Sequence, residues 1–143
     1  MRVLIAVAES LSQAHAALLA DLRELEQAVH PSSGESLAEL RARLGEVRAD
    51  ITKHFRFEEQ NGYMDVVRKR EPRLERNIQQ LADEHRLLAG TLDGLVRKSG
   101  AVSKLGETLR QEVRAWIERV RQHEARENDL IQDAFNLDIG TED

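Results

Sequence analysis

The chain has 143 residues, a formal net charge of −5 and 33% charged residues of both signs, which suits one globular domain without the basic block of a nucleic-acid binder. Aromatic residues make up 3%, and there is no cysteine, so disulfides, thiolate metal sites and a cysteine nucleophile are excluded. No stretch approaches the roughly 18–20 apolar residues of a membrane span, and the first ten residues lack the features of a secretory leader. We therefore expect a cytoplasmic protein that binds neither membrane nor nucleic acid.

Four helices are expected along the chain, at roughly 9–29, 36–69, 72–98 and 102–134. The first break is the loop signal of residues 30–34, after which Ser36 and Glu39 suit a capping box. The second lies before Pro72, which suits the first turn of a helix, and the third at Ser99-Gly100. Short connections make neighbouring helices antiparallel. The sequence thus predicts an all-α, up-down-up-down four-helix bundle, a single domain over 1–143, with an acidic tail over 135–143.

Each expected helix carries a stripe of apolar residues at alternating spacings of three and four, the pattern of a helix that buries one face. Histidines and glutamates interrupt all four stripes at positions where leucine is expected. Helix rise counted from the three breaks brings the histidines to one zone, within about two turns of each other. The six residues that interrupt the stripes are His15, His54, Glu58, His85, His123 and Glu127.

Burying one unpartnered polar group costs roughly 2–7 kcal/mol, against a net protein stability of about 5–15 kcal/mol. Six such groups must therefore satisfy one another or share a common partner. A lone buried histidine such as His15 is usually a satisfied core residue, and a closed network of His–Glu hydrogen bonds is the alternative for the whole set. Four histidines and two carboxylates at one level favour a metal centre, and we predict these six residues as its ligands.

The spacing defines the kind of centre. His54 with Glu58, and His123 with Glu127, are each four residues apart and project from one helix face. Four imidazoles and two carboxylates suit two first-row metal ions bridged by both carboxylates, and such donors favour iron, manganese or zinc. None of the residues three before the four histidines is glutamate, so the Glu-x-x-His site of ferritin-like bundles is excluded.

With these motifs the chain resembles the hemerythrin-like family, the HHE cation-binding domains. The resemblance covers nearly the whole chain, including the strings HFRFEE at 54–59 and DEHR at 83–86. It implies two non-haem iron ions in an oxo- or hydroxo- and carboxylate-bridged pair, with zinc or manganese as substitutes. It also implies binding or sensing of oxygen and related species. His15 and His54 would serve one iron and His85 and His123 the other, while the bridges would be Glu58 and Glu127.

One departure from the oxygen-carrying hemerythrins bears on function. They have a second histidine four residues from the first on the third helix, whereas here both candidate positions, Leu81 and Ala89, are apolar. Water, a nearby carboxylate or a tyrosine must take the place of that histidine. This disfavours reversible oxygen storage and favours sensing, peroxide or nitric oxide chemistry, or iron handling.

We expect a binding or sensing protein for a small diatomic ligand or peroxide, acting as a monomer or weak homodimer. A di-iron oxidoreductase that consumes peroxide or nitric oxide is the first alternative. A helical interaction module with a zinc or empty site is the second.

Five residues outside the predicted ligand set are also singled out. Tyr63, the only tyrosine, follows Gly62, which could loosen the helix and let the phenol reach the site, although packing is the expected role. Glu59 is expected to face solvent or a neighbouring helix. Glu84 and Glu124 lie one residue off the stripes and are expected to form salt bridges or orient the adjacent histidine. We expect His30 to be exposed.

Overall fold

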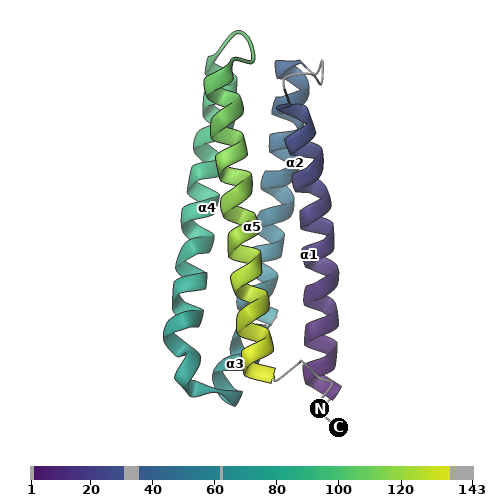
Figure 1. The fold of residues 1–143 in the computed structure, drawn as a ribbon, viewed down its shortest axis with the longest axis vertical. Helices are drawn as coiled ribbons and strands as arrows, with labels where there is room; N and C mark the ends of the chain where they lie inside the picture. The colour runs from purple at the N-terminus through teal and green to yellow at the C-terminus, as the bar shows by residue number, and fades with distance from the viewer. Residues whose placement is uncertain (1, 31–35, 62, 136–143) are drawn as a thin grey trace.

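The computed structural model describes residues 2–30, 36–61 and 63–135. Four long helices stand side by side (Figure 1): α1 (Arg2–Ala28), α2 (Leu37–Arg56), α4 (Glu75–Ala101) and α5 (Glu107–Phe135). Three short segments connect α2 to α4, namely the π-helical η1 (Phe57–Asn61), α3 (Tyr63–Arg70) and the 3₁₀-helical η2 (Pro72–Leu74). The described residues include no strand.

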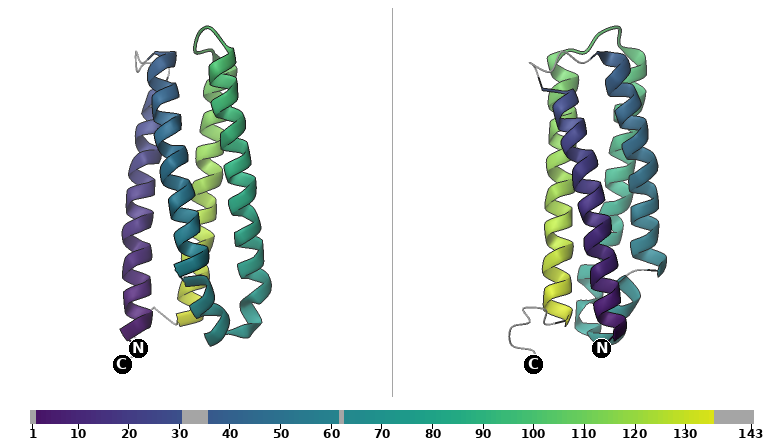
Figure 2. Two further views of the ribbon diagram at one scale, coloured as in Figure 1. Left: turned by 180° about the vertical axis from the view of Figure 1, so that it is seen from behind. Right: turned by 90° about the vertical axis from the view of Figure 1, so that its right-hand side faces the viewer.

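The long helices form a ring in which each contacts two others, in the order α1, α2, α4, α5. Each runs antiparallel to its neighbours, and the α4–α5 connection lies at the end of the bundle opposite α3 (Figures 1 and 2). The prediction of an all-α up-down-up-down bundle is confirmed. Among the described residues, no helix combines the length and apolar character needed to span a bilayer.

Local signals explain several helix ends. Ser36 caps α2, its hydroxyl accepting a bond of 3.2 Å from the Glu39 backbone N–H. Pro72 opens η2, which leads directly into α4. At the other end of α4, the guanidinium of Arg41 donates to the carbonyls of Ser99 (2.6 Å) and Val102 (3.1 Å). These bonds satisfy carbonyls that a helix C-terminus leaves without intrahelical partners.

Several predicted helix boundaries are wrong. The first helix begins at Arg2 rather than near residue 9, because residues 2–8 contain no glycine or proline to stop it. The second is not continuous over 36–69, since η1 interrupts it. The third continues through Ser99-Gly100 to Ala101, and the fourth begins at Glu107 instead of 102. Gly62 and most of the predicted acidic tail, residues 136–143, lie outside the described residues.

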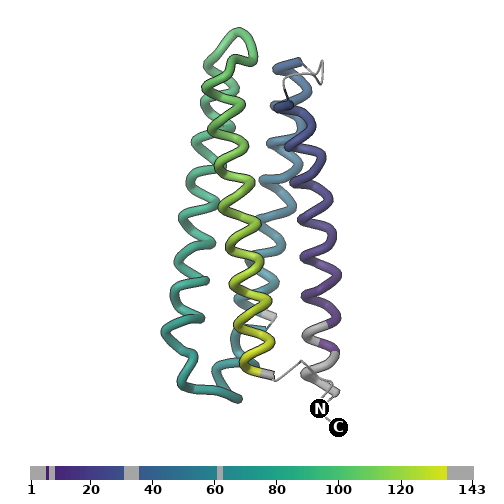
Figure 3. Tube along the Cα trace, viewed as in Figure 1, coloured from purple at the N-terminus to yellow at the C-terminus, as the bar shows by residue number. Residues whose placement is uncertain are grey.

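The bundle interior contains two apolar clusters. The larger, near the α4–α5 connection, is built on leucines of all four long helices and includes Trp116, whose indole N–H donates to the Leu88 carbonyl at 2.9 Å. The smaller gathers Tyr63 and Met64 of α3 with Leu81 of α4 and Leu130 of α5. Figure 3 traces α3 at the end of the bundle where this smaller cluster lies. The side chains that belong to neither cluster, although buried, are mostly histidines and glutamates.

Candidate metal centre

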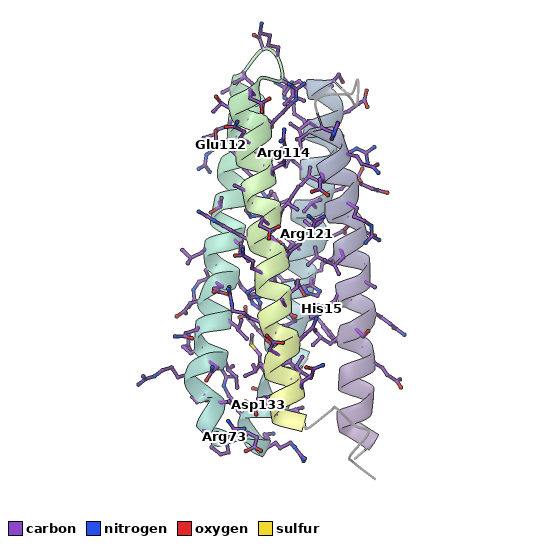
Figure 4. All side chains as sticks on the ribbon, in the orientation of Figure 1. His15, Arg73, Glu112, Arg114, Arg121 and Asp133 are labelled. Carbon is purple, nitrogen blue, oxygen red and sulfur yellow. The ribbon has the colours of Figure 1, made fainter. Side chains whose placement is uncertain are left out.

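All six residues predicted from the interrupted stripes are buried, at no more than 7% exposure. They come from all four long helices and from η1. Figure 4 places His15 in the half of the bundle that contains α3. The structure therefore brings together every predicted ligand candidate in one buried layer: His15, His54, Glu58, His85, His123 and Glu127.

Two of the carboxylates lie between the histidines. Glu58 places Oε2 at 3.2 Å from His15 Nε2 and 3.3 Å from His54 Nε2, and Oε1 at 3.0 Å from His85 Nε2. Glu127 places Oε1 at 3.3 Å from His15 Nε2, and Oε2 at 3.5 Å from the Nε2 atoms of both His85 and His123. Each carboxylate thus faces two groups of imidazoles, and we call Glu58 and Glu127 the shared carboxylates.

The donor atoms form two overlapping groups, each with all its candidate ligand atoms within 4.8 Å of one another. We call the group of His15, His54 and Glu124 the first position, and the pair His85 and His123 the second position. The shared carboxylates belong to both groups. This grouping separates the histidines as the family resemblance implies.

Glu124 is the residue that sequence reasoning missed as a candidate ligand. It is 2% exposed, and its Oε2 lies 2.5 Å from His15 Nε2 while its Oε1 lies 3.4 Å from His54 Nε2. The expected salt bridge is confirmed, but it joins Glu124 to His15 and His54 and not to the adjacent His123, so that Glu124 lies among the candidate ligand atoms. A signal was available: the buried pairs Trp116-Ile117 and Leu130-Ile131 flank the pair 123–124 at intervals of seven residues. Helix α5 buries two adjacent positions per heptad because it packs on both α1 and α4.

The outer ring nitrogens of three histidines have partners on neighbouring helices. His85 Nδ1 lies 2.5 Å from Glu59, and His123 Nδ1 lies 2.7 Å from Glu84. His15 Nδ1 lies 3.2 Å from the side-chain oxygen of Asn128. Such partners hold the proton on Nδ1 and direct the Nε2 lone pair toward the interior, which is the arrangement of metal-bound histidines. Glu59 contacts a neighbouring helix, as expected. Glu84 forms the expected salt bridge, with Arg126, but the histidine it contacts is His123 across the α4–α5 interface and not the adjacent His85.

Phe55 supports the second position from α2. Its ring stacks on His85 with ring centroids 3.9 Å apart and planes 10° from parallel. It meets His123 edge-on, at a centroid distance of 5.8 Å. The phenyl ring therefore fixes the plane of one imidazole and shields the other from water.

Tyr63 is fully buried, and its hydroxyl donates to Glu127 Oε2 at 2.8 Å. Burial, followed by the charge of Glu127, raises the pKa of Tyr63, so the phenol remains protonated and acts as a donor. The π-helical η1 immediately precedes Gly62 and Tyr63 in the chain. Such wide turns often occur at functional sites, and here α3 presents the phenol to a shared carboxylate.

Without metal, the layer holds protons. Burial lowers the pKa of each histidine, but the glutamate carboxylates that contact its ring nitrogens outweigh this effect. The pKa rises to about 12 for His15, about 9 for His54 and about 10 for His85, and that of His123 is also raised. Burial raises the pKa of Glu127, yet its bonds with His123, His15 and His85 bring that pKa well below its usual range. The carboxylates that raise these pKa values would favour a bound cation at the same place.

Several of these close contacts do not have the geometry of a hydrogen bond. Buried atoms without a partner include Nε2 of His54, His85 and His123 and one or both oxygens of Glu58, Glu124 and Glu127. A native protein keeps few such atoms, since each costs about 1–3 kcal/mol. They face one another across distances of about 3 Å or slightly more, as ligands around a common ion do. The donor set therefore fits metal.

The fold and the layer define an antiparallel helical bundle with a buried histidine–carboxylate centre. The family model of the hemerythrin HHE cation-binding domain matches residues 6–135. The chain therefore belongs to the hemerythrin HHE cation-binding domain family. Comparison with curated proteins and with solved structures finds no significant match to either.

Proposed function

We propose that this domain holds two iron ions, one at each position, and binds or senses a small ligand such as oxygen, nitric oxide or peroxide. The observation that carries the proposal is the pair of shared carboxylates, whose oxygens face both groups of histidines. Two separate single-metal sites would not need carboxylates common to both. Imidazole with carboxylate and no thiolate is a donor set that suits iron, with zinc and manganese as substitutes.

The side chains of this layer would have distinct roles. The four Nε2 atoms and Glu124 would bind the ions, and the shared carboxylates would hold the ions close together. Bound iron supplies coordination positions for a small ligand and the capacity to change oxidation state. The apolar clusters on either side of the layer would restrict access to small molecules.

The first experiment is to measure metal identity and stoichiometry by mass spectrometry on protein expressed with iron and never exposed to chelator. The double variant His54→Ala/His123→Ala removes one imidazole from each position. The exposed His30 provides the matched control as His30→Ala. We expect about two irons per chain in the native protein and the control, and none in the double variant. Native protein that binds no iron even after anaerobic loading would refute the proposal.

One observation favours a second candidate, a di-iron oxidoreductase that consumes peroxide. Glu59 and Glu84 contact the second-position histidines, and their side chains are 38% and 30% exposed. They link the buried rings to bulk water and could carry the protons that peroxide disproportionation requires, in which one peroxide is oxidised to oxygen and another is reduced to water. Sustained oxygen release from peroxide by the iron-loaded protein would favour this enzyme. A stoichiometric spectral change without turnover would favour binding or sensing.

A further inference from the structure

An open cavity of about 640 Å³ lies at the end of the bundle opposite α3, where the α4–α5 connection meets the start of α2 (Figure 1). Arg41 lines it and precedes His54 by thirteen residues on α2, so the cavity is about 20 Å from the histidine–glutamate layer along that helix. Its volume is within the range of about 300–1,000 Å³ that is typical of small-molecule sites. The proposed iron centre makes no use of this cavity.

The charge of the cavity lining differs from that of the rest of the molecule. Three cationic side chains line it, Arg41 from α2, Lys104 from the α4–α5 connection and Arg110 from α5, and none of the described residues that line it is acidic. The whole chain has a net charge of −5. Two smaller cavities of about 260 Å³ between α4 and α5 are both lined by Glu84. The larger cavity therefore favours anionic ligands.

Arg41 is held in place by backbone carbonyls. Its Nε donates to the Ser99 carbonyl at 2.6 Å, and its Nη2 donates to the Val102 carbonyl at 3.1 Å. A guanidinium has five N–H donors, so three remain for other partners after these two bonds. A charged group that is already fixed loses little conformational freedom when a ligand binds. Arg41 thus supplies preorganised positive charge to the cavity.

Arg110 has positive charge that its protein neighbours balance only weakly. Its Nε is buried and has no hydrogen-bond partner, and Glu107 Oε2 lies as far as 4.0 Å from its Nη1. Glu107 also faces Arg114, at 3.7 Å, so one carboxylate serves two guanidiniums. Buried donors without a partner are rare in folded proteins, and an anion in the cavity would supply the missing acceptor. Lys104 is exposed and adds a third, movable charge.

Apolar side chains form the rest of the wall. Leu37, Val102 and Leu105 line the cavity, and Val102 is 39% exposed. Such a wall suits a ligand that has an organic part as well as a charged group.

We propose that this cavity binds a small soluble phosphate monoester, with the phosphate among the three cations and the organic part against the apolar wall. A phosphate monoester has a charge of about −2 above its second pKa of about 6, and guanidinium groups match the geometry of its oxygens. The net charge of −5 opposes docking on an anionic bilayer, which favours a soluble ester over a lipid headgroup. This site is additional to the proposed function and does not depend on iron.

Phenyl phosphate is the probe, and phenyl sulfate is its control, because it has a similar shape and one negative charge fewer. Isothermal titration calorimetry of the iron-loaded protein at pH 8 should show one phenyl phosphate per chain, bound about tenfold or more tightly than phenyl sulfate. The absorbance of the iron centre should not change, and protein without iron should bind equally well. Equal affinity for the two esters, no binding, or binding that needs iron would overturn the proposal.

Variants locate the site. Arg110→Ala should raise the dissociation constant of phenyl phosphate about tenfold or more, because bonds to a charged group are lost. Lys104→Ala should raise it about two- to fivefold, as expected for an exposed charge. The matched control is Lys69→Ala, which removes an exposed lysine of α3 at the other end of the bundle and should leave the dissociation constant unchanged.

The variant set stays informative if one member does not fold. Arg110→Lys should recover part of the affinity lost in Arg110→Ala, and melting temperatures show which variants are folded. Lys104→Ala changes only an exposed side chain, so it tests the site even where Arg110→Ala is unfolded. Equal dissociation constants in Lys104→Ala and Lys69→Ala would overturn the location.

Vesicles distinguish a soluble ligand from a lipid. Phosphatidic acid presents the same phosphate monoester at a bilayer surface. We expect the protein to sediment no more with phosphatidylcholine vesicles that contain phosphatidic acid than with phosphatidylcholine alone. Sedimentation with phosphatidic acid, together with no affinity for phenyl phosphate, would assign the cavity to a lipid headgroup and overturn the proposal of a soluble ester.

Discussion

The two positions of the centre share a layer, a pair of carboxylates and one helix, yet they differ in the charge around them. The first position has a buried carboxylate of its own, Glu124, and the outer nitrogen of His15 contacts a neutral amide, Asn128. The second has no carboxylate of its own, but its outer nitrogens contact the carboxylates of Glu59 and Glu84. Beyond the shared carboxylates, which contribute to both positions, negative charge enters the first position as a direct donor, Glu124, and reaches the second only through the imidazole rings.

The difference follows from helix geometry. His123 and Glu124 are adjacent on α5, about 100° apart around its axis, so one faces α4 and the other α1. Glu127, one turn further along, lies between these two directions and reaches both positions. Three residues of one helix therefore contribute to two unlike sites, and each site can be altered separately.

The largest expected effect on metal content comes from removing a shared carboxylate. Glu58→Ala deletes a carboxylate whose oxygens lie 3.0–3.3 Å from three imidazoles on three helices. Both ions should be lost, so that metal content falls from about two per chain to nearly none, as measured by mass spectrometry. The exposed Glu118 gives the control, Glu118→Ala, which should keep full metal content. Retention of one tightly held ion in Glu58→Ala would show that the positions are independent.

The second effect is a dependence of metal binding on pH. Histidine binds metal only when neutral, and the carboxylate partners raise the pKa of His54 to about 9 and of His85 to about 10 in the metal-free protein. Protonated imidazoles stabilise the metal-free fold below their unfolded pKa of about 6.5, and this stabilisation is lost as pH rises toward 9–10. Metal binding must expel these protons and therefore strengthens over the same range.

The difference in melting temperature between loaded and metal-free protein should accordingly widen from pH 6 to pH 9. Calorimetry in buffers of different ionisation enthalpy should detect more than one proton released per ion at pH 7. A constant difference in melting temperature together with no proton release would mean that the histidines do not bind the metal.

A smaller effect on metal affinity is expected from changing the residues that contact the Nδ1 atoms of the histidines. This effect should differ between the two positions. Glu59→Gln replaces the carboxylate that holds His85 with an amide, and changes of this kind typically weaken metal binding about 10–100-fold. Glu59→Gln should weaken the binding of one ion, the one at the second position, and leave the binding constant of the other ion unchanged. Asn128→Asp, the reverse change at His15, should strengthen binding of the other ion. Stepwise competition with a chelator measures both constants, and equal weakening of the two by Glu59→Gln would contradict the separation.

Much of this centre could be predicted because its six stripe residues interrupt otherwise regular leucine patterns. A polar residue such as His85, between Leu81 and Leu88, is conspicuous in sequence, and helix rise then fixes its level in the bundle. The same periodicity predicts the antiparallel bundle. These features depend on local repeats, which the sequence carries explicitly.

The features that could not be predicted from the sequence depend on which helices pack against each other. Glu124 is buried because α1 packs beside α5. If α5 is assumed to bury only one stripe of residues, Glu124 falls outside that stripe and is expected to be exposed. The π-helical η1 changes the register between Glu58 and Tyr63, yet its residues do not differ in propensity from an ordinary helix. The end of α4 was misplaced because Arg41, a residue 58 positions away, satisfies the Ser99 carbonyl.

The smallest expected effect comes from a variant of Tyr63. It tests whether the phenol acts as a hydrogen-bond donor or as a metal ligand at the second position. Tyr63→Phe removes the bond to Glu127 and leaves one buried oxygen with fewer partners, which should cost about 1 kcal/mol and lower the melting temperature by roughly 2–4 °C. Metal content should stay at about two, because the phenol stays protonated and donates to Glu127. Thr52→Val is the control, since it removes an exposed hydroxyl bond to the Arg48 carbonyl and should have a smaller effect on melting. Loss of one ion from Tyr63→Phe would instead make the phenol the group that replaces the missing histidine, and the two positions would then have equal numbers of donors.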